Sequence, residues 1–366
     1  MSVVTEALVV GDAMIPKSLF EPALERHLGA FVERFTGGDW ESDWRRLQHR
    51  RLEVEKHGPE IEAVPEVVIQ APDAEMLLGL FVPVSSQLLD VLPKLRIVGV
   101  CRAGLENVNL DEATRRSVLV FNVQGRNAHA VSDFTVGLML AESRNIARAH
   151  ASILRGEWRK KFPNSDSIPE MRGKCVGIVG FGQIGQLVAR KLAGFDVEII
   201  VFDPDVDEAI VAENGAERVE KETLFERSDF ITVHFRLNDA TRGMIGAAEL
   251  QRMKRTAYLL NTARAGLIDY EALATVLERG AIAGAAIDVF PEEPPPEASR
   301  LRALDNVTLT THIAGTTTEV LTNSPYLLAE DIERLLRGGT PHFVVNPEVL
   351  ERKACAEWLS TVRARP

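Results

Sequence analysis

Residues 176–185 read Val176-Gly177-Ile178-Val179-Gly180-Phe181-Gly182-Gln183-Ile184-Gly185, a short apolar run followed by glycines in the spacing G-x-G-x-x-G. The next residues place Leu187, Val188 and Leu192 on one side of an expected helix. A glycine-rich turn between a strand and a helix predicts a dinucleotide site. Gly180 permits a tight turn, Gly182 lets the backbone approach a pyrophosphate, and Gly185 allows close helix–strand packing. The helix N-terminus offers free N–H groups to the anion.

An acidic residue follows at the spacing that this kind of site requires. Asp203 ends the apolar run 197–202, and a carboxylate there can accept hydrogen bonds from the adenosine ribose hydroxyls. It also repels a 2′-phosphate, and Asp205, Asp207 and Glu208 add negative charge nearby. We therefore predict NAD rather than NADP as the cofactor. A plain carboxylate at the end of a strand is the alternative interpretation of Asp203.

Short apolar runs alternate with helical patterns on both sides of this motif. Such alternation predicts an α/β protein with parallel sheets covered by helices. A helix is expected after Asn122, and another over 317–337. Ser18 is expected to cap a helix over 18–28, and Asp269 is expected to cap a helix that Gly280 ends. The expected strands are 7–10, 67–70, 96–100, 176–179, 197–202, 230–233, 257–260, 283–287 and 307–310.

The bulk composition restricts the kinds of partner. With 366 residues, two domains are the default expectation, and the formal net charge of −11 disfavours nucleic acid. The three cysteines are scattered, which suggests neither a disulfide framework nor a metal site. The N-terminus has no signal-peptide pattern, and no apolar run is long enough to span a membrane. We expect a cytoplasmic protein with a small-molecule substrate.

Three residues beyond strand ends form a candidate catalytic set. Arg264, Glu293 and His312 each follow an expected parallel strand on its carboxyl side, where ligands bind in such sheets. A histidine can exchange a proton near neutral pH, and a carboxylate beside it favours its protonated form. An arginine can clamp a carboxylate and polarise a carbonyl. Singly, each has an ordinary explanation, namely a surface arginine, a solvated turn glutamate and a structural histidine.

Four segments together resemble one enzyme family. They are the glycine turn 180–185, NTARAGLID at 261–269, AGAAIDVFPEEP at 283–294 and THIAG at 311–315. In this order they are similar to the D-isomer-specific 2-hydroxyacid dehydrogenases, most familiarly the phosphoglycerate dehydrogenase branch. The similarity extends over most of residues 65–347. It implies hydride transfer between NAD(H) and a D-2-hydroxy acid or its 2-keto partner, with a phosphorylated or sugar-derived acid as one option.

The resemblance also implies the domain organisation. Two Rossmann-like domains are expected: a discontinuous, flavodoxin-like substrate domain of residues 1–123 and 315–345, and an NAD domain of residues 124–314. Residues 346–366 would be a tail, and the active site would lie in the cleft between the domains. The family is typically dimeric, with the segment after Asn122 at the interface.

Individual roles carry over by motif. Arg264 would bind the substrate carboxylate and keto oxygen, His312 would donate or accept the proton, and Glu293 would partner it. Asp288 would contact the nicotinamide. The remaining residues expected to line the dinucleotide are Gln183, Ile184, Thr262, Ala263, Ala314 and Gly315.

The loop 101–107 is expected to offer backbone N–H groups to the substrate carboxylate, which makes Arg102, Ala103 and Gly104 candidate substrate-binding residues. Arg102 replaces a commoner small residue. Together with Arg126 it is a hypothetical site for a second anionic group, and a surface pair with Glu106 is the alternative.

Two further departures from the family pattern lie near the expected substrate and cofactor sites. Ala265 replaces a usual glycine beside the expected catalytic arginine, and Arg236 replaces a usual proline. Two other functions remain open from the sequence. One is an NAD-responsive binding module of the corepressor type, and the other is a phosphite-oxidising enzyme on the same fold.

Overall fold

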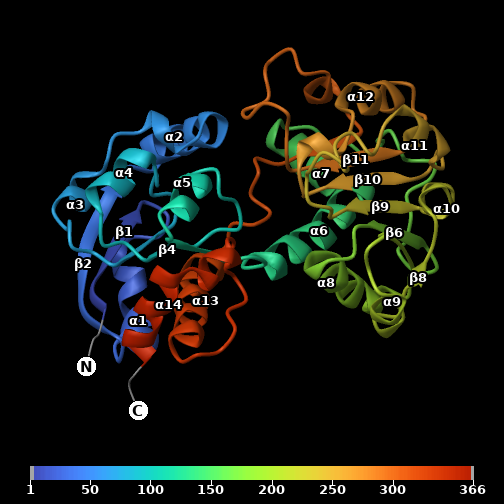
Figure 1. Ribbon diagram of the computed structural model, residues 1–366. Coiled ribbons are helices and arrows are strands. Elements are labelled where there is room, and N and C mark those ends of the chain that lie inside the picture. Colours follow the sequence, from blue (N-terminus) through green and yellow to red (C-terminus); the bar gives the residue numbers. More distant parts are fainter. Residues whose placement is uncertain (1–3, 364–366) are drawn as a thin grey trace. The chain divides into compact units, whose positions relative to one another are not determined.

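The computed structural model describes residues 4–363, which divide into two compact units. Unit 1 contains the chain up to Arg126 together with the segment from Thr317 onward, and unit 2 contains residues 127–316. Each unit is built around one parallel sheet with helices on both faces (Figure 1). The α/β class with two parallel-sheet units agrees with the expectation from the sequence.

Unit 1 has five parallel strands in the order β2-β1-β3-β4-β5, the flavodoxin-like order. Its elements are β1 (Val4–Asp12), α1 (Lys17–Leu28), β2 (Val32–Glu41), α2 (Trp44–His57), α3 (Glu66–Ile69), β3 (Met76–Gly79), α4 (Ser86–Val91), β4 (Ile97–Val100), α5 (Leu110–Arg115), β5 (Leu119–Asn122), α13 (Thr318–Leu336) and α14 (Lys353–Arg363).

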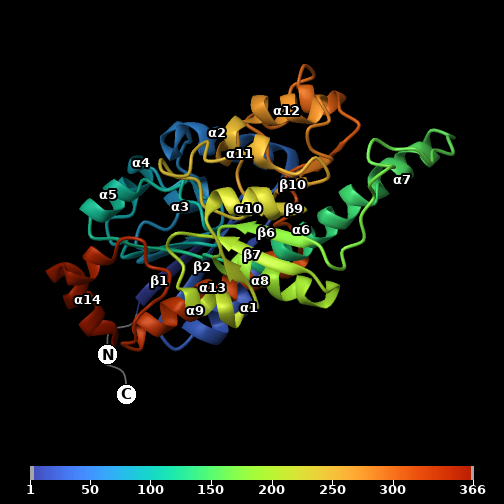
Figure 2. The same ribbon diagram turned by 90° about the vertical axis from the view of Figure 1, so that its right-hand side faces the viewer.

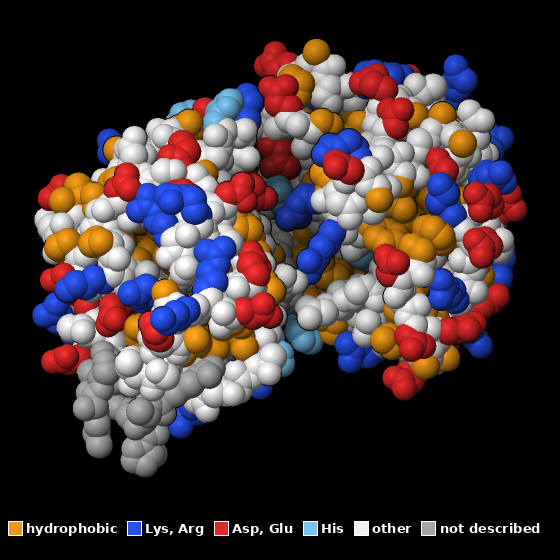
Figure 3. All heavy atoms as spheres, viewed as in Figure 1, with side chains coloured by type: hydrophobic (Ala, Val, Ile, Leu, Met, Phe, Trp, Pro, Cys, Tyr) orange, Lys and Arg blue, Asp and Glu red, His pale blue; other side chains and the backbone are white. Residues whose placement is uncertain are grey.

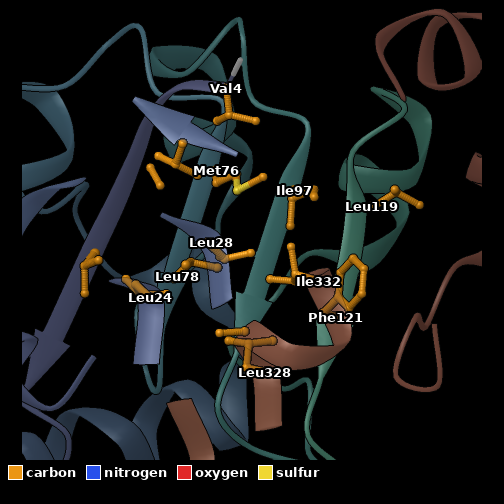
Figure 4. Packing of buried hydrophobic residues seen from close by; sticks show 14 of the residues in the cluster. Val4, Leu24, Leu28, Met76, Leu78, Ile97, Leu119, Phe121, Leu328 and Ile332 are labelled. Carbon is orange, nitrogen blue, oxygen red and sulfur yellow. The ribbon is translucent and has the colours of Figure 1, made fainter. Parts of the chain in front are cut away.

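Alternating side chains of these strands supply two apolar layers. On one face, strand residues such as Leu78 and Phe121 pack against Leu24 of α1 and against Leu328 and Ile332 of α13 (Figure 4). The opposite face packs against α3, α4 and α5. Because both faces are buried, the central strands read as continuous apolar runs rather than as alternating ones.

Unit 2 has seven parallel strands in the order β12-β11-β10-β9-β6-β7-β8. The chain reverses its direction of growth between β6 and β9, which is where doubly wound sheets bind their ligands. Its elements are α6 (Ala128–Ser143), α7 (Ile146–Leu154), β6 (Cys175–Val179), α8 (Gln183–Leu192), β7 (Glu198–Phe202), α9 (Glu208–Glu213), β8 (Glu217–Arg218), α10 (Lys221–Arg227), β9 (Phe230–Val233), α11 (Ala247–Arg252), β10 (Tyr258–Asn261), α12 (Tyr270–Glu278), β11 (Gly284–Ile287) and β12 (Val307–Leu309).

Helices cover both faces of this second sheet as well. Helices α6 and α8 pack on one face, and α10, α11 and α12 pack on the other. The expected cap of α12 is present, because the Asp269 side chain accepts hydrogen bonds from Glu271 N and Ala272 N. Helix α7 and the loop after it extend away from the body of unit 2 (Figure 2).

Three local expectations need correction or completion. Residues 67–70 were expected as a strand but belong to the short helix α3, in which only Val68 is buried. Helix α1 begins at Lys17 after Pro16, so Ser18 lies inside it. Beyond residue 346, where a tail was expected, the chain forms α14, whose Trp358 and Leu359 belong to the core of unit 1.

No helix within the described range 4–363 is both long enough and apolar enough to cross a membrane. On the face shown in Figure 3, acidic and basic side chains are interspersed, without a broad basic patch.

Candidate active site

The glycine turn follows β6 directly and requires its glycines for different reasons. Gly180 has a φ of +96°, and a Cβ atom there would lie 2.7 Å from the backbone nitrogen of Phe235. A Cβ at Gly185 would lie 2.4 Å from the carbonyl oxygen of Gly180. At Gly182 a Cβ would have no heavy atom within 4 Å, so this side of the turn is open. Among the residues that the structure describes, no side chain caps the N-terminus of α8, and its first N–H groups therefore fit an anionic ligand.

Asp203 is held against this turn. One carboxylate oxygen accepts a hydrogen bond from Phe181 N at 2.7 Å, and the other accepts one from Asp205 N at 3.0 Å. The carboxylate therefore has a defined position beside the open turn, where an acidic residue was expected. These bonds leave lone pairs on both oxygens for further donors.

His312 and Glu293 are in contact, although they come from separate loops. The Nδ1 atom of His312 lies 2.8 Å from Oε2 of Glu293, and Oε1 of Glu293 accepts a hydrogen bond from Phe290 N at 3.1 Å. With the carboxylate as acceptor, Nδ1 carries the hydrogen, and Nε2 is the nitrogen left to exchange a proton. The imidazole is 40% exposed, so a ligand can reach it.

The loop that bears His312 is fixed by Asp288. This fully buried carboxylate accepts hydrogen bonds from Thr310 Oγ1 at 2.6 Å, Ile313 N at 3.0 Å and Ala314 N at 2.9 Å. His312 itself has a φ of +56°, which is uncommon for a residue other than glycine. Both oxygens of Asp288 therefore accept hydrogen bonds from the loop, and these bonds hold the backbone on both sides of His312 in place.

Arg264 follows β10 and is exposed. Its backbone oxygen accepts a hydrogen bond from Asn261 Nδ2 at 3.0 Å, and the other end of that amide accepts one from Ala263 N at 3.0 Å. Ala265 begins a short 3-10 helix directly after the arginine. The guanidinium donates to the Ala263 carbonyl at 2.8 Å, so the exposed arginine is anchored locally by one nitrogen.

Two positioning residues escaped the sequence analysis. Asn261 was noticed only as part of a motif, yet its buried amide shapes the Arg264 loop. Tyr270 donates to the Val289 carbonyl at 2.5 Å. Burial raises the pKa of the Tyr270 hydroxyl, and the nearby charges of Glu293 and Asp288 raise it further. No sequence signal distinguished this tyrosine from an ordinary helix residue.

A third residue near the site that the sequence analysis missed is His234, just past β9. Its backbone N–H bonds to the Val179 carbonyl, which places it beside the glycine turn. Its Nε2 lies 2.9 Å from Thr232 Oγ1, and its Nδ1 is buried without a partner among the residues described. Burial lowers the pKa of His234 to about 3, so the ring is neutral.

The other expected cofactor residues lie past neighbouring strand ends of unit 2. The Thr262 hydroxyl is 2.9 Å from that of Thr135 in α6. Ala314 is buried, and a Cβ at Gly315 would lie 2.5 Å from the Asn127 side-chain nitrogen. Gln183 and Ile184 open helix α8, as the motif requires.

In the loop 101–107 of unit 1, several backbone N–H groups have no described acceptor in this unit, whereas the Arg102 side chain forms ion pairs. Among the described residues of this unit, no acceptor pairs with the backbone N–H groups of residues 102–104. Asn122 Nδ2 donates to the Ala103 carbonyl at 2.7 Å and holds the loop in place. Arg102 Nη2 lies 2.8 Å from a Glu55 oxygen and 3.0 Å from a Glu106 oxygen. The pair with Glu106, considered above as the alternative for Arg102, is therefore present.

Comparison with known proteins identifies the family of the chain. The family profile described as "D-isomer specific 2-hydroxyacid dehydrogenase, NAD binding domain" matches residues 136–314. The chain is 38% identical over 292 residues to a glyoxylate reductase of Thermofilum pendens, covering 78% of this chain and 85% of that protein. It is 38% identical over 273 residues to a D-3-phosphoglycerate dehydrogenase of Methanocaldococcus jannaschii, covering 74% of this chain and 51% of that protein.

Among solved structures, the apo form of D-lactate dehydrogenase from Escherichia coli has a TM-score of 0.70 at 25% identity, covering 92% of this chain and 99% of that one. Fold and site together define a dehydrogenase that uses a nicotinamide dinucleotide. The chain belongs to the D-isomer-specific 2-hydroxyacid dehydrogenases. It is an NAD-dependent oxidoreductase that transfers a hydride between NAD(H) and a D-2-hydroxy acid or the corresponding 2-keto acid.

Proposed function

We propose that His312 is the proton donor and acceptor of this reaction, that Glu293 is its partner, and that Arg264 binds the substrate carboxylate and keto oxygen. The observation that carries the proposal is the 2.8 Å contact between His312 Nδ1 and Glu293 Oε2. This contact fixes the ring, so that Nε2 is the nitrogen that would exchange a proton with the reacting oxygen. The planar guanidinium of Arg264 would match the substrate carboxylate, and its positive charge would polarise the carbonyl.

The cofactor would lie on the glycine turn, where the residues present fit a dinucleotide. NAD supplies the hydride acceptor when bound. The open side at Gly182 and the uncapped start of α8 would hold its pyrophosphate. Asp203 would accept hydrogen bonds from the ribose, and its charge would disfavour a 2′-phosphate. Thr262, Ala263, Ala314 and Gly315 would line the dinucleotide.

The unpaired backbone N–H groups of Arg102, Ala103 and Gly104 would hold the substrate carboxylate. As the substrate we propose a small 2-keto acid of the kind reduced by the relatives named above, either glyoxylate-like or phosphorylated. The sequence pattern that favours NAD over NADP also favours NADH as the reductant in the test.

A His312→Ala variant tests the catalytic assignment. It should lower kcat by at least about 100-fold, the usual size of a general acid–base contribution, and leave the Kd for NADH within about threefold. His57→Ala, which changes a half-exposed histidine in α2, is the matched control and should remain fully active. A fully active His312→Ala protein would end the assignment. If the unaltered protein binds NADH and reduces no acid in a panel of 2-keto acids, a corepressor-type binding function replaces the enzyme.

We further propose that the protein is a cytoplasmic homodimer that uses α7 and the loop after it. Four large apolar side chains there are exposed, by 56%, 52%, 74% and 78% for Ile146, Ile153, Leu154 and Trp158. Exposed apolar clusters of this kind usually mark an interface. The mass in solution by light scattering should be twice the 40.4 kDa of one chain, and Leu154→Asp should lower it toward one chain. A monomeric unaltered protein would refute the dimer.

A further inference from the structure

In unit 1, polar groups from four parallel strands gather at one edge of the sheet. Asp12 ends β1, Phe81 follows β3, Arg102 follows β4, and Arg126 follows β5. The carboxyl ends of parallel strands are the edge where such sheets bind ligands. This edge also carries the loop whose free N–H groups we assign to the substrate.

Arg126 forms no ion pair with the described residues of this unit, although its side chain is partly buried. Its Nη1 atom lies 3.2 Å from the hydroxyl of Ser324, and no carboxylate oxygen of the described part of unit 1 lies within 4.0 Å. Arg50 and Arg116 of the same unit each contact carboxylates. Burial is the main cause that lowers the pKa of Arg126; Cys101 opposes it, the charge of Arg102 lowers the pKa further, and Asp12 has a small raising effect.

A partly buried cation without an anionic partner is unfavourable in the free protein. The rest of the fold must offset this cost in the free protein, and a bound anion would remove the cost. The charge of Asp12 acts on Arg126 without an ion pair, because the Asp12 oxygens accept hydrogen bonds from Met14 N, Ile15 N and Phe81 N.

Arg102 offers a second unsatisfied donor at the same edge. Its Nη2 atom is engaged by the two glutamates described above, whereas its Nη1 atom is buried and has no hydrogen-bond partner among the residues described. The guanidinium lies over the Phe81 ring, 4.8 Å from the ring centre, which keeps it in place. A buried donor without an acceptor is destabilising until an acceptor arrives.

We propose that Arg126, assisted by Nη1 of Arg102, binds a second anionic group of the substrate, so that the enzyme acts on D-2-hydroxy acids that carry another carboxylate or a phosphate monoester. The proposal rests on the proposed function, in which the loop 101–107 holds the reacting end of the same substrate. A guanidinium binds either anion through two parallel N–H donors, which explains why an arginine rather than a lysine stands at this position.

The test compares keto acids that differ in their number of anionic groups. With NADH, kcat/KM is measured for glyoxylate and pyruvate, which have one, for oxaloacetate, which has two carboxylates, and for 3-phosphohydroxypyruvate, which has a phosphate. We expect at least one of the last two to be preferred at least tenfold over the first two. Which of them is preferred identifies the second group as a carboxylate or a phosphate.

Arg126→Gln should lower the ratio of kcat/KM for the preferred dianionic acid to that for glyoxylate by about 10- to 100-fold, the size of a lost charge-assisted hydrogen bond. The matched control is Arg115→Gln, which removes an arginine that is 69% exposed and paired with Glu112. It should leave the ratio within twofold. A ratio unaffected by Arg126→Gln, or equal losses for all four acids, would overturn the proposal.

A thermal-unfolding assay decides the proposal independently of turnover. Because Arg126→Gln removes a partly buried charge that has no ion pair, the variant should unfold at the same temperature as the unaltered protein or higher when no ligand is present. 3-Phosphohydroxypyruvate or oxaloacetate should raise the melting temperature of the unaltered protein and not that of the variant. Equal stabilisation of both would refute the anion site. If no keto acid is reduced at all, the proposed function fails, while this assay still decides whether Arg126 binds a dianion.

Discussion

Replacement of Asp288 by asparagine tests how the loop of His312 is held. The side chain is fully buried, and its two oxygens accept three hydrogen bonds, from Thr310, Ile313 and Ala314. An asparagine keeps one acceptor oxygen and turns the other position into an NH2 donor. Whichever way the amide is oriented, that NH2 group faces a backbone N–H, so at least one bond is replaced by a donor–donor contact.

The size of the effect follows from these bonds. A hydrogen bond to a charged group contributes about 1.5–3 kcal/mol, and leaving its buried donor unsatisfied adds to the loss. The left-handed backbone of His312 carries a strain of roughly 1–3 kcal/mol that the flanking bonds must hold. With about 2–3 kcal/mol of anchoring lost, the loop can relax. Since about 1.4 kcal/mol is a factor of ten in rate, kcat should fall by roughly 30- to 150-fold.

The assay separates positioning from cofactor binding. Asp288→Asn should lower kcat while the Kd for NADH, measured by fluorescence, changes by less than about threefold. Asp269→Asn is the matched control, because it makes the same chemical change at the exposed cap of α12, where asparagine caps equally well. An unchanged kcat together with a tenfold weaker Kd for NADH would show that Asp288 acts through the nicotinamide and not through the loop.

Three further outcomes are expected. Gly185→Ala should lower the melting temperature, since a Cβ there meets the Gly180 carbonyl at 2.4 Å, whereas Gly182→Ala, with open space around it, should leave the melting temperature unchanged and weaken NADH binding. Asp203→Ala should lower NADH affinity about tenfold and narrow the NADH-to-NADPH affinity ratio, both measured by titration. Burial raises the pKa of Asp12 from 3.8 in the unfolded chain to about 6, so the free energy of unfolding should fall by about 2 kcal/mol as pH rises from 4 to 6, and Asp12→Asn should abolish this slope in urea titrations.

Much of unit 2 could be predicted because its signals are local. A strand, a glycine turn and a helix follow one another within residues 175–192, and each is visible in a short window of sequence. Unit 1 was less predictable, because β2, β3 and β5 were not among the expected strands. Strand β2 lies at an edge of the sheet and has mostly half-exposed residues, so it lacks the apolar run that revealed β1 and β4. Residues 66–69 showed the opposite error, because an apolar run formed a short helix after Pro65.

The individual site residues were visible from the sequence, because each follows a predicted strand, but their coupling was not. That coupling depends on strand register. Strands β11 and β12 pair Ile287 with Leu309, so the next residue on each strand, Asp288 and Thr310, meet at 2.6 Å. A register shifted by one residue would turn the Asp288 carboxylate away from this loop. The position of His312 is therefore set by a pairing of segments about twenty residues apart, which no local pattern in the sequence encodes.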